Sequence, residues 1–382
     1  MKTHDSICYF DCNSTTPIEP DVLEAMRAYL TDEFGNASSR THEYGARANR
    51  AVGKARSQIA DVVDAEPSEV IFTSGATESN NIAIFGLENY AREGNKLHII
   101  TSSIEHKAVL EPFGILGERG FDVTYIAPTG GGWVDPSDIA NALRPDTAFV
   151  SIMHVNNETG IIQPIEEICD ALDGHDAYFH TDAAQGFGKD IKRLQNSRID
   201  LISISGHKIY GPKGIGALIA RKREGIDSLP LTPIMYGGGQ ERGIRPGTLP
   251  VHLIAGLGKA SEIAQNNNVE RAEKCTAIRN ALKSNFSELN PIYHGDPERQ
   301  LPHIVNVSFD NIDSEAIMLV LKDLVAISNG SACNSSKYEP SHVLAAMNLS
   351  QENLLSSTRW SWSHLSNAPE WNKIVTTIKS LY

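Results

Sequence analysis

Short apolar stretches alternate with longer segments of helical periodicity between about residues 67 and 260. Several apolar stretches run without the polar alternation of a half-exposed strand, which is typical of parallel sheets buried on both faces. The predicted strands are Val70–Thr73, His98–Thr101, Val123–Ile126, Ala148–His154, Tyr178–His180, Leu201–Ile204 and Gly216–Ala220. The predicted helices between them include Thr77–Ala91, Ala108–Arg119, Pro136–Leu143 and Ile165–Leu172. This alternation predicts an α/β fold with a mostly parallel seven-stranded sheet covered by helices.

The pattern changes after about residue 260. A long polar helix is predicted for Ser261–Leu289, followed by a strand at Ile304–Phe309, a helix from Ser314 and a strand at Val325–Ser328. This order is typical of a smaller α+β domain. We therefore expect a large domain at residues 15–258 and a small domain formed by residues 1–14 and 259–382. A loop at about residues 328–340 would belong to the small domain.

The charge of the chain narrows the choice of partners. With 34 basic and 47 acidic residues, the formal net charge is -13, which disfavours direct binding to nucleic acid. No apolar stretch approaches the roughly 20 residues of a membrane-spanning helix. The first residues lack the basic and then apolar layout of a signal peptide. We expect a cytoplasmic protein that contacts neither a membrane nor DNA directly.

The cysteines do not form a disulfide framework or a metal site. The chain has only five of them: Cys8, Cys12, Cys169, Cys275 and Cys333. Cys8 and Cys12 lie four residues apart, but no second close pair or neighbouring histidine completes a zinc site. Cys333 differs from the others because it lies in a run of small polar residues, where a buried structural thiol fits poorly. It is the candidate reactive thiol.

One segment is a candidate phosphate site. The chain has no Gly-x-Gly-x-x-Gly after a strand and no P-loop motif. In Phe72–Asn80, however, a strand turns through small residues directly into a helix, so that free N–H groups and the Thr77 hydroxyl would face one anion. Taken alone, this segment is more often a simple helix N-cap.

Two charged residues follow predicted strands. Asp182 lies at the carboxyl end of one strand, the edge where ligands bind in open α/β sheets. Its carboxylate can keep a pyridine nitrogen protonated, or it can simply cap the next element. Lys208 follows another strand in Ser205–Lys208, where partial burial would favour the nucleophilic free amine over a surface charge. Lys213 is the local rival, but Pro212 and Gly214 suggest an exposed loop.

Together, these segments resemble the cysteine desulfurases of the NifS/IscS type, which are fold-type-I pyridoxal-phosphate enzymes of the class V aminotransferase family. The resemblance covers nearly the whole chain, in order. The segments that carry it are Asp11–Pro17, Thr73–Ser79, Glu105–Val109, Val155–Gly160, Asp182–Gln185, Ser205–Lys208, Gly237–Arg242, Gly247–Pro250, Ser331–Cys333 and Ser357–Arg359.

The resemblance implies a role for each matching residue. Lys208 would hold pyridoxal 5'-phosphate as a Schiff base, Asp182 would face the ring nitrogen, and His106 would stack on the ring and act as an acid or base. Arg359 would bind the substrate carboxylate. The other implied cofactor contacts are Ala76, Thr77, Asn157 (also a substrate contact), Gln185, Ser205, His207 and Thr248. Thr248 would reach the phosphate from the neighbouring subunit, which implies a homodimer.

Cys333 indicates the reaction type that the resemblance implies. Lys208 would take the Cα proton of bound L-cysteine, and the Cys333 thiolate would attack the substrate sulfur. The products are L-alanine and a persulfide on Cys333, with His106 as the expected proton donor or acceptor. The pattern around Cys333 is similar to the long-loop group of these enzymes.

Some residues depart from the housekeeping members of the family. Pro246 precedes Gly247–Pro250, Trp360–His364 replaces the usual segment after Arg359, and only a short stretch follows. These features are closer to DndA, the desulfurase type that serves DNA phosphorothioation. The sulfur would pass to an acceptor protein of that machinery or, alternatively, to iron–sulfur scaffolds or tRNA thiolation.

Three other readings remain open. A selenocysteine lyase or another cysteine C–S lyase would share the fold but would not need Cys333. A sulfur-carrier scaffold would keep the fold without catalysis. A thiol hydrolase that uses Cys333 and a histidine would leave Asp182 and Lys208 unexplained.

Overall fold

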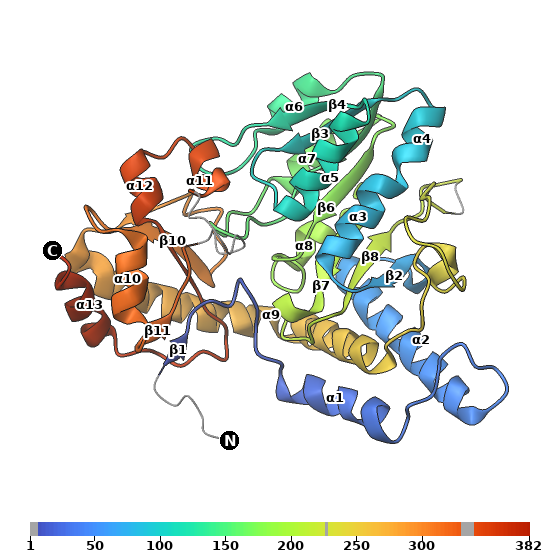
Figure 1. Ribbon diagram of the computed structural model, residues 1–382, viewed down its shortest axis with the longest axis horizontal. Coiled ribbons are helices and arrows are strands. Elements are labelled where there is room, and N and C mark those ends of the chain that lie inside the picture. The colour runs from blue at the N-terminus through green and yellow to red at the C-terminus, as the bar shows by residue number, and fades with distance from the viewer. Residues whose placement is uncertain (1–6, 226–227, 330–339) are drawn as a thin grey trace.

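The computed structural model describes residues 7–225, 228–329 and 340–382 (Figure 1). Its centre is a seven-stranded sheet with the strand order β2-β8-β7-β6-β5-β3-β4. The strands are β2 (Val70–Thr73), β3 (His98–Ser102), β4 (Asp122–Ile126), β5 (Thr147–Ser151), β6 (Tyr178–Asp182), β7 (Leu201–Ser205) and β8 (Gly216–Ala220). All neighbouring strands from β4 to β7 are parallel, whereas β8 runs antiparallel to both β7 and β2. The predicted mostly parallel seven-stranded sheet is confirmed.

Helices cover both faces of this sheet (Figure 1). Because side chains alternate along a strand, Ile99 packs on one face and Ile100 on the other. One face is covered by α3 (Ala76–Gly86), α4 (Glu88–Glu93) and α5 (Lys107–Glu118). The other is covered by α2 (Glu43–Val63), α6 (Pro136–Ala142), α7 (Ile165–Ala171), α8 (Ile191–Leu194) and the first half of α9 (Val251–Phe286). Helix α1 (Pro20–Thr31) packs beside α9.

A second core lies around smaller sheets. One has the order β12-β10-β9 and the other pairs β1 with β11. Their strands are β1 (Cys8–Tyr9), β9 (Ile292–Tyr293), β10 (Ile304–Ser308), β11 (Val325–Ala326) and β12 (Thr358–Ser361). The remaining helices are α10 (Ser314–Leu321), α11 (His342–Ala346), α12 (Gln351–Ser356) and α13 (Trp371–Lys379). Trp360 and Trp362 are fully buried there against Phe286 and Phe10.

Helix α9 connects the two cores as one continuous element of about 54 Å. It begins ten residues before the predicted start at Ser261 and passes through the predicted domain boundary at 258/259. The glycines in this part mark close helix packing. A Cβ on Gly258 would lie 2.7 Å from the Ala55 Cβ, and one on Gly256 would lie 2.8 Å from Met26. The division into two domains stays a prediction.

Two predicted elements differ in detail. The predicted helix Thr77–Ala91 is divided into α3 and α4 at Leu87. The N–H of Thr232 binds the Gly86 carbonyl at 2.8 Å, and Leu231 lies 3.0 Å from where a Gly86 Cβ would be, so a crossing segment occupies this position. The predicted strand Ala148–His154 ends at Ser151. In the described part of the chain, no helix combines the length and apolarity needed to span a membrane.

Candidate active site

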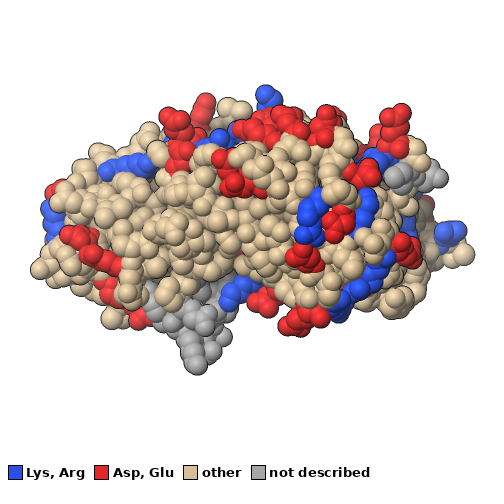
Figure 2. Space-filling view, turned by 90° about the horizontal axis from the view of Figure 1, so that it is seen from above, with Lys and Arg blue, Asp and Glu red and all other residues tan. Residues whose placement is uncertain are grey.

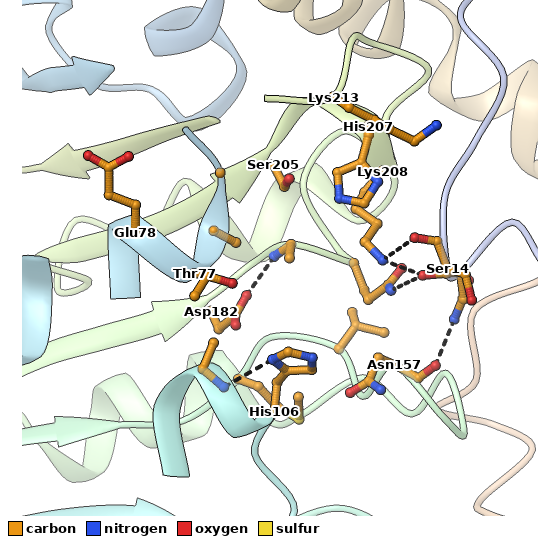
Figure 3. Close-up of a pocket in the computed structure, with 18 of the residues that line it drawn as sticks. Ser14, Thr77, Glu78, His106, Asn157, Asp182, Ser205, His207, Lys208 and Lys213 are labelled. Carbon is orange, nitrogen blue, oxygen red and sulfur yellow. Dashed lines mark hydrogen bonds between the residues drawn. The ribbon is translucent and has the colours of Figure 1, made fainter. Parts of the chain in front are cut away.

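A cavity of about 680 Å³ opens at the carboxyl ends of β6 and β7, beside the first turn of α3 (Figure 3). This volume is within the range of small-molecule pockets. Segments far apart in the sequence line it, from Asn13 to Arg359. The predicted site residues that line it are Ala76, Thr77, His106, Asn157, Asp182, Gln185, Ser205, His207, Lys208 and Arg359. Ten residues chosen from sequence are therefore brought to one pocket.

Asp182 is the last residue of β6 and is only 5% exposed. One carboxylate oxygen accepts a hydrogen bond from Asn80 Nδ2 at 2.7 Å, and the other accepts the N–H of Ala184 at 2.9 Å. Two donors on a nearly buried carboxylate fix its orientation. Asn80 lies in α3 and reaches Asp182 only through the packing of this helix on the sheet, so no local pattern indicates this contact.

Lys208 ends the short 3-10 turn η2 (Gly206–Lys208), which directly follows β7. Its ammonium donates to the carbonyl oxygens of Asn13, at 2.5 Å, and Ser14, at 2.9 Å. Figure 3 shows the Lys208 side chain pointing towards Ser14. Lys213, the rival from sequence, is exposed at the rim of the pocket. The geometry thus favours Lys208 as the amine of the site.

Two histidines of the pocket are kept neutral by their surroundings. Burial lowers the pKa of His106, and the opposing charge of Asp182 does not cancel this effect. The Nδ1 atom of His106 accepts the N–H of Ala108 at 3.1 Å, so a neutral ring carries its proton on Nε2. Burial, with Lys208 and Lys213, lowers the pKa of His207 to about 4. Both rings can therefore donate a hydrogen bond from one nitrogen and accept one at the other.

The first turn of α3 supplies donors for an anion. Gly75 precedes it with φ +154°, and Ala76 and Thr77 lie at the edge of the pocket. Unpaired N–H groups at a helix start attract negative charge. Glu78 is held aside by an ion pair with Arg245 at 2.8 Å and by the N–H of Ser74 at 2.6 Å. Burial works against it, but these two partners hold the pKa of Glu78 below its usual value.

Asn157 and Arg359 also line the pocket, and Figure 3 shows Asn157 across from Thr77. The Arg359 guanidinium, only 4% exposed, donates to the Asn157 carbonyl at 3.0 Å, to Asp11 at 2.7 Å and to Ser14 Oγ at 2.8 Å. Its Nε–H is buried and has no partner among the described residues. A planar fork with one unused donor can bind a carboxylate. Asp11 and Ser14 as partners of Arg359 were not expected from sequence.

The pocket fits pyridoxal 5'-phosphate, the cofactor predicted from sequence. The Gln185 amide donates to the Asn13 carbonyl at 2.9 Å, but its Oε1 is buried without a partner among the described residues. Buried acceptor atoms are normally hydrogen-bonded, so an unpaired oxygen in the wall of a cavity indicates that a bound group donates to it. Phosphate donors around Thr77 and His207, the Asp182 carboxylate and the Lys208 amine surround the same space.

Of the predicted residues that the structure describes, Thr248 is not in this pocket. It is exposed and does not line the cavity of its own chain. Cys333 lies outside the described residues. Among the other cysteines, burial raises the pKa of Cys12 to about 11 and that of Cys169 and Cys275 to about 12, while Cys8 is raised too. These four thiols are protonated at neutral pH and are poor nucleophiles.

The chain is similar to known proteins over nearly its whole length. Residues 8–370 match the model of the aminotransferase class-V family. The chain is 44% identical to cysteine desulfurase IscS of Pectobacterium carotovorum, over 97% of this chain and 91% of that one. The solved structure of DndA from Streptomyces lividans has 46% identity and a TM-score of 0.83, covering 93% of this chain and 98% of that one. The structure of SspA in complex with cysteine has 41% identity and a TM-score of 0.79, with the same coverage.

These likenesses agree with the resemblance found in the motifs and with the fold-type-I architecture of the large sheet. They extend through both cores and through the pocket, not through one motif alone. The chain belongs to the aminotransferase class-V family and, within it, to the pyridoxal-phosphate-dependent cysteine desulfurases.

Proposed function

We propose that this chain, acting as a cytoplasmic homodimer, takes the sulfur atom of L-cysteine onto Cys333, releases L-alanine, and passes the sulfur to the machinery of DNA phosphorothioation. One observation carries the reaction: Arg359 lines the same cavity as Lys208, Asp182 and His106, the last three of which are labelled in Figure 3. This set supplies an amine, an anchor for a ring nitrogen, a proton carrier and a carboxylate clamp.

Each element of the site would hold one part of the cofactor. Ala76, Thr77, Ser205 and His207 would bind the phosphate, with Thr248 of the partner subunit. His106 would stack on the ring, with Asn157 and Gln185 beside its hydroxyl. When bound, the cofactor supplies an electron sink for negative charge at the substrate Cα. Asp182 would maintain that sink, because its carboxylate, held by Asn80 and Ala184, stabilises a protonated ring nitrogen.

Lys208 would move the proton of the reaction. As a free amine it would take the Cα proton of the bound cysteine and later return a proton to the carbon skeleton. Between these two proton transfers, the Asn13 and Ser14 carbonyls would hold the amine at the side of the pocket. Arg359 would orient the substrate through its carboxylate, with the Asn157 side chain next to it.

The sulfur step is proposed for Cys333. Its thiolate would attack the substrate sulfur, so that an S–S bond forms while the Cβ–S bond breaks, and the electron pair returns to the carbon skeleton. Protonation there completes the methyl group of alanine. In balance, L-cysteine and one enzyme thiol become L-alanine and one enzyme persulfide, and no outside oxidant or reductant is needed. His106 would transfer the protons of this step.

The destination of the sulfur rests on likeness to DndA. Direct action on DNA is disfavoured, since acidic residues outnumber basic ones and the two kinds are interspersed on the face seen in Figure 2. An acceptor protein would therefore carry the sulfur onward.

The residues after Arg359 that depart from the housekeeping pattern have a structural role. Trp360 and Trp362 fill the second core, and Trp362 Nε1 donates to the Cys275 carbonyl at 3.0 Å.

Labelled cysteine tests the reaction. The purified protein is incubated with [³⁵S]cysteine, and sulfane label and alanine are measured in the wild type and in Cys333→Ser. We expect label on Cys333 and almost no alanine from Cys333→Ser, which should still absorb as the cofactor-bound protein. Alanine formation at the wild-type rate by Cys333→Ser would favour a selenocysteine or cysteine C–S lyase instead.

The destination has its own test. Labelled protein is mixed with a purified DNA-phosphorothioation partner and, separately, with an iron–sulfur scaffold. Faster transfer to the first is expected. Transfer to the scaffold alone would refute the proposed destination and leave the desulfurase reaction intact.

A further inference from the structure

Residues 156–160 form a tight loop that brings Asn157 to the pocket. The Asn156 side chain accepts the N–H groups of Glu158, at 2.9 Å, and Thr159, at 3.0 Å. Gly160 has φ +74°, and a Cβ there would lie 2.2 Å from the Ile304 side chain. Only glycine allows the main chain to come this close to Ile304, so the conformation of the loop is fixed by its packing on β10.

Glu158 is buried next to Asn157, with 4% of its surface exposed. Its carboxyl oxygen Oε2 accepts a short hydrogen bond from Ser341 Oγ. Burial raises the pKa of Glu158, against the effects of Ser341, His342 and Arg359. A glutamine side chain has nearly the same shape and keeps an oxygen that can accept from Ser341. The proposed reaction assigns Glu158 no role.

Ser341 is the N-cap of α11. Its Oγ accepts the N–H of Leu344 at 3.1 Å, and its carbonyl accepts the N–H of Ala345 at 3.0 Å. The neighbouring His342 contacts the Glu105 carbonyl at 2.9 Å, one residue before His106. The start of α11 is thus attached to two segments that each carry a pocket residue.

The chain before Cys333 is attached to the pocket as well. Ser328 and Arg359 pair through their main chains, with N–O distances of 3.2 and 2.6 Å. Cys333 is five residues after Ser328 and eight before Ser341. An extended chain allows it at most about 18 Å from the first attachment and about 29 Å from the second. Both attachments therefore limit where its thiol can go.

We propose that Glu158 is a positioning residue for sulfur transfer: through Ser341 it ties the chain that returns from Cys333 to the loop that carries Asn157. The inference rests on the proposed role of Cys333. A thiolate must come within about 3.5 Å of the substrate sulfur, and a displacement of about 1 Å can cost ~10²-fold in rate. A shared anchor for the thiol segment and a substrate contact reduces such displacement.

The test separates sulfur transfer from substrate binding. Glu158→Ala, Glu158→Gln and Ser341→Ala are loaded with cofactor, and the rate of Cys333 persulfide formation is measured in a single turnover at several cysteine concentrations. We expect Glu158→Ala and Ser341→Ala to slow the saturated rate about tenfold. The half-saturating cysteine concentration should change less than about twofold. Glu158→Gln should restore most of the rate, because its amide oxygen still accepts from Ser341.

A double-mutant cycle checks that the two residues act together. Glu158→Ala/Ser341→Ala should be no slower than the slower single variant, since both remove the same hydrogen bond. If the rate reductions of the two single variants multiply in the double variant, the shared anchor is refuted. Hydrogen exchange gives a readout without turnover: the N–H groups of Leu344 and Ala345 should exchange faster in Glu158→Ala.

Glu69→Ala is the matched control. Glu69 is a buried carboxylate that accepts the N–H groups of Glu66, at 2.9 Å, and Lys222, at 2.7 Å, and it does not line the pocket. It should lower stability without slowing persulfide formation in the folded enzyme. A wild-type transfer rate in Glu158→Ala and Ser341→Ala would overturn this inference alone. Alanine formation by Cys333→Ser would overturn it together with the proposed reaction.

Discussion

The two sides of the pocket are built in different ways. On the sheet side, Asp182 and Lys208 directly follow neighbouring buried strands, and Asp182 takes one of its donors only two residues further on. On the opposite side, Arg359 in β12 is held by Asp11 and Ser14, more than 340 residues away, and by the Asn157 carbonyl. Strand ends thus place Asp182 and Lys208 at the pocket, although their partners Asn80, Asn13 and Ser14 are distant in sequence, whereas distant segments alone place Arg359.

The largest expected effect is on the sheet side. Lys208→Ala should lower the rate of alanine formation by ~10³-fold or more, because it removes both the amine that holds the cofactor and the proton carrier. The absorption band of the bound cofactor should change while the thermal unfolding temperature stays close to that of the wild type. Lys213→Ala is the control and should keep most of the activity. Equal losses in the two variants would contradict the assignment.

The same difference explains what could be predicted from sequence. The strands near Asp182 and Ser205 were predicted within one or two residues, because buried parallel strands show as continuous apolar runs. The pocket residues that follow them were found for the same reason. The supporting roles of Asp11, Asn80 and Glu158, which lie behind the pocket lining, were not predicted, because tertiary packing sets their partners and a local pattern does not contain it.

The substrate side should show an intermediate effect. Arg359→Lys keeps the charge but loses the planar fork that donates to Asp11, Ser14 and Asn157 at once. The loss of one charge-assisted hydrogen bond, about 1.5–3 kcal/mol, predicts a 10- to 100-fold lower kcat/KM for cysteine. Steady-state kinetics and the unchanged cofactor absorption band check this. A drop in cofactor content would mean that Arg359 also affects cofactor binding and not substrate binding alone.

A smaller effect is expected for Asp11→Asn. The amide can still accept from Arg359 but no longer neutralises it, so the guanidinium should be less firmly oriented. We expect KM for cysteine to rise about three- to tenfold with kcat nearly unchanged, in line with a net hydrogen-bond contribution of roughly 1 kcal/mol. Ser14→Ala, which removes the other Nη2 contact, should act in the same direction. A fall in kcat without a change in KM would place Asp11 in the chemical step instead.

The smallest effect at neutral pH belongs to His180, which fixes the sheet side. It bridges three strands, with Nδ1 2.7 Å from Ser151 Oγ and Nε2 2.9 Å from Ser203 Oγ. Burial lowers the pKa of His180 to about 4. Its contribution to stability is therefore complete above pH 6.5 and is lost as the pH falls towards 4, because the unfolded chain binds the proton first. His180→Gln should lose less stability than the wild type between pH 6.5 and 4, by up to about 3 kcal/mol. Unfolding curves in urea across this pH range give the free energy of unfolding of both proteins. A parallel decline in the two would show that His180 binds its proton as readily in the folded chain as in the unfolded chain.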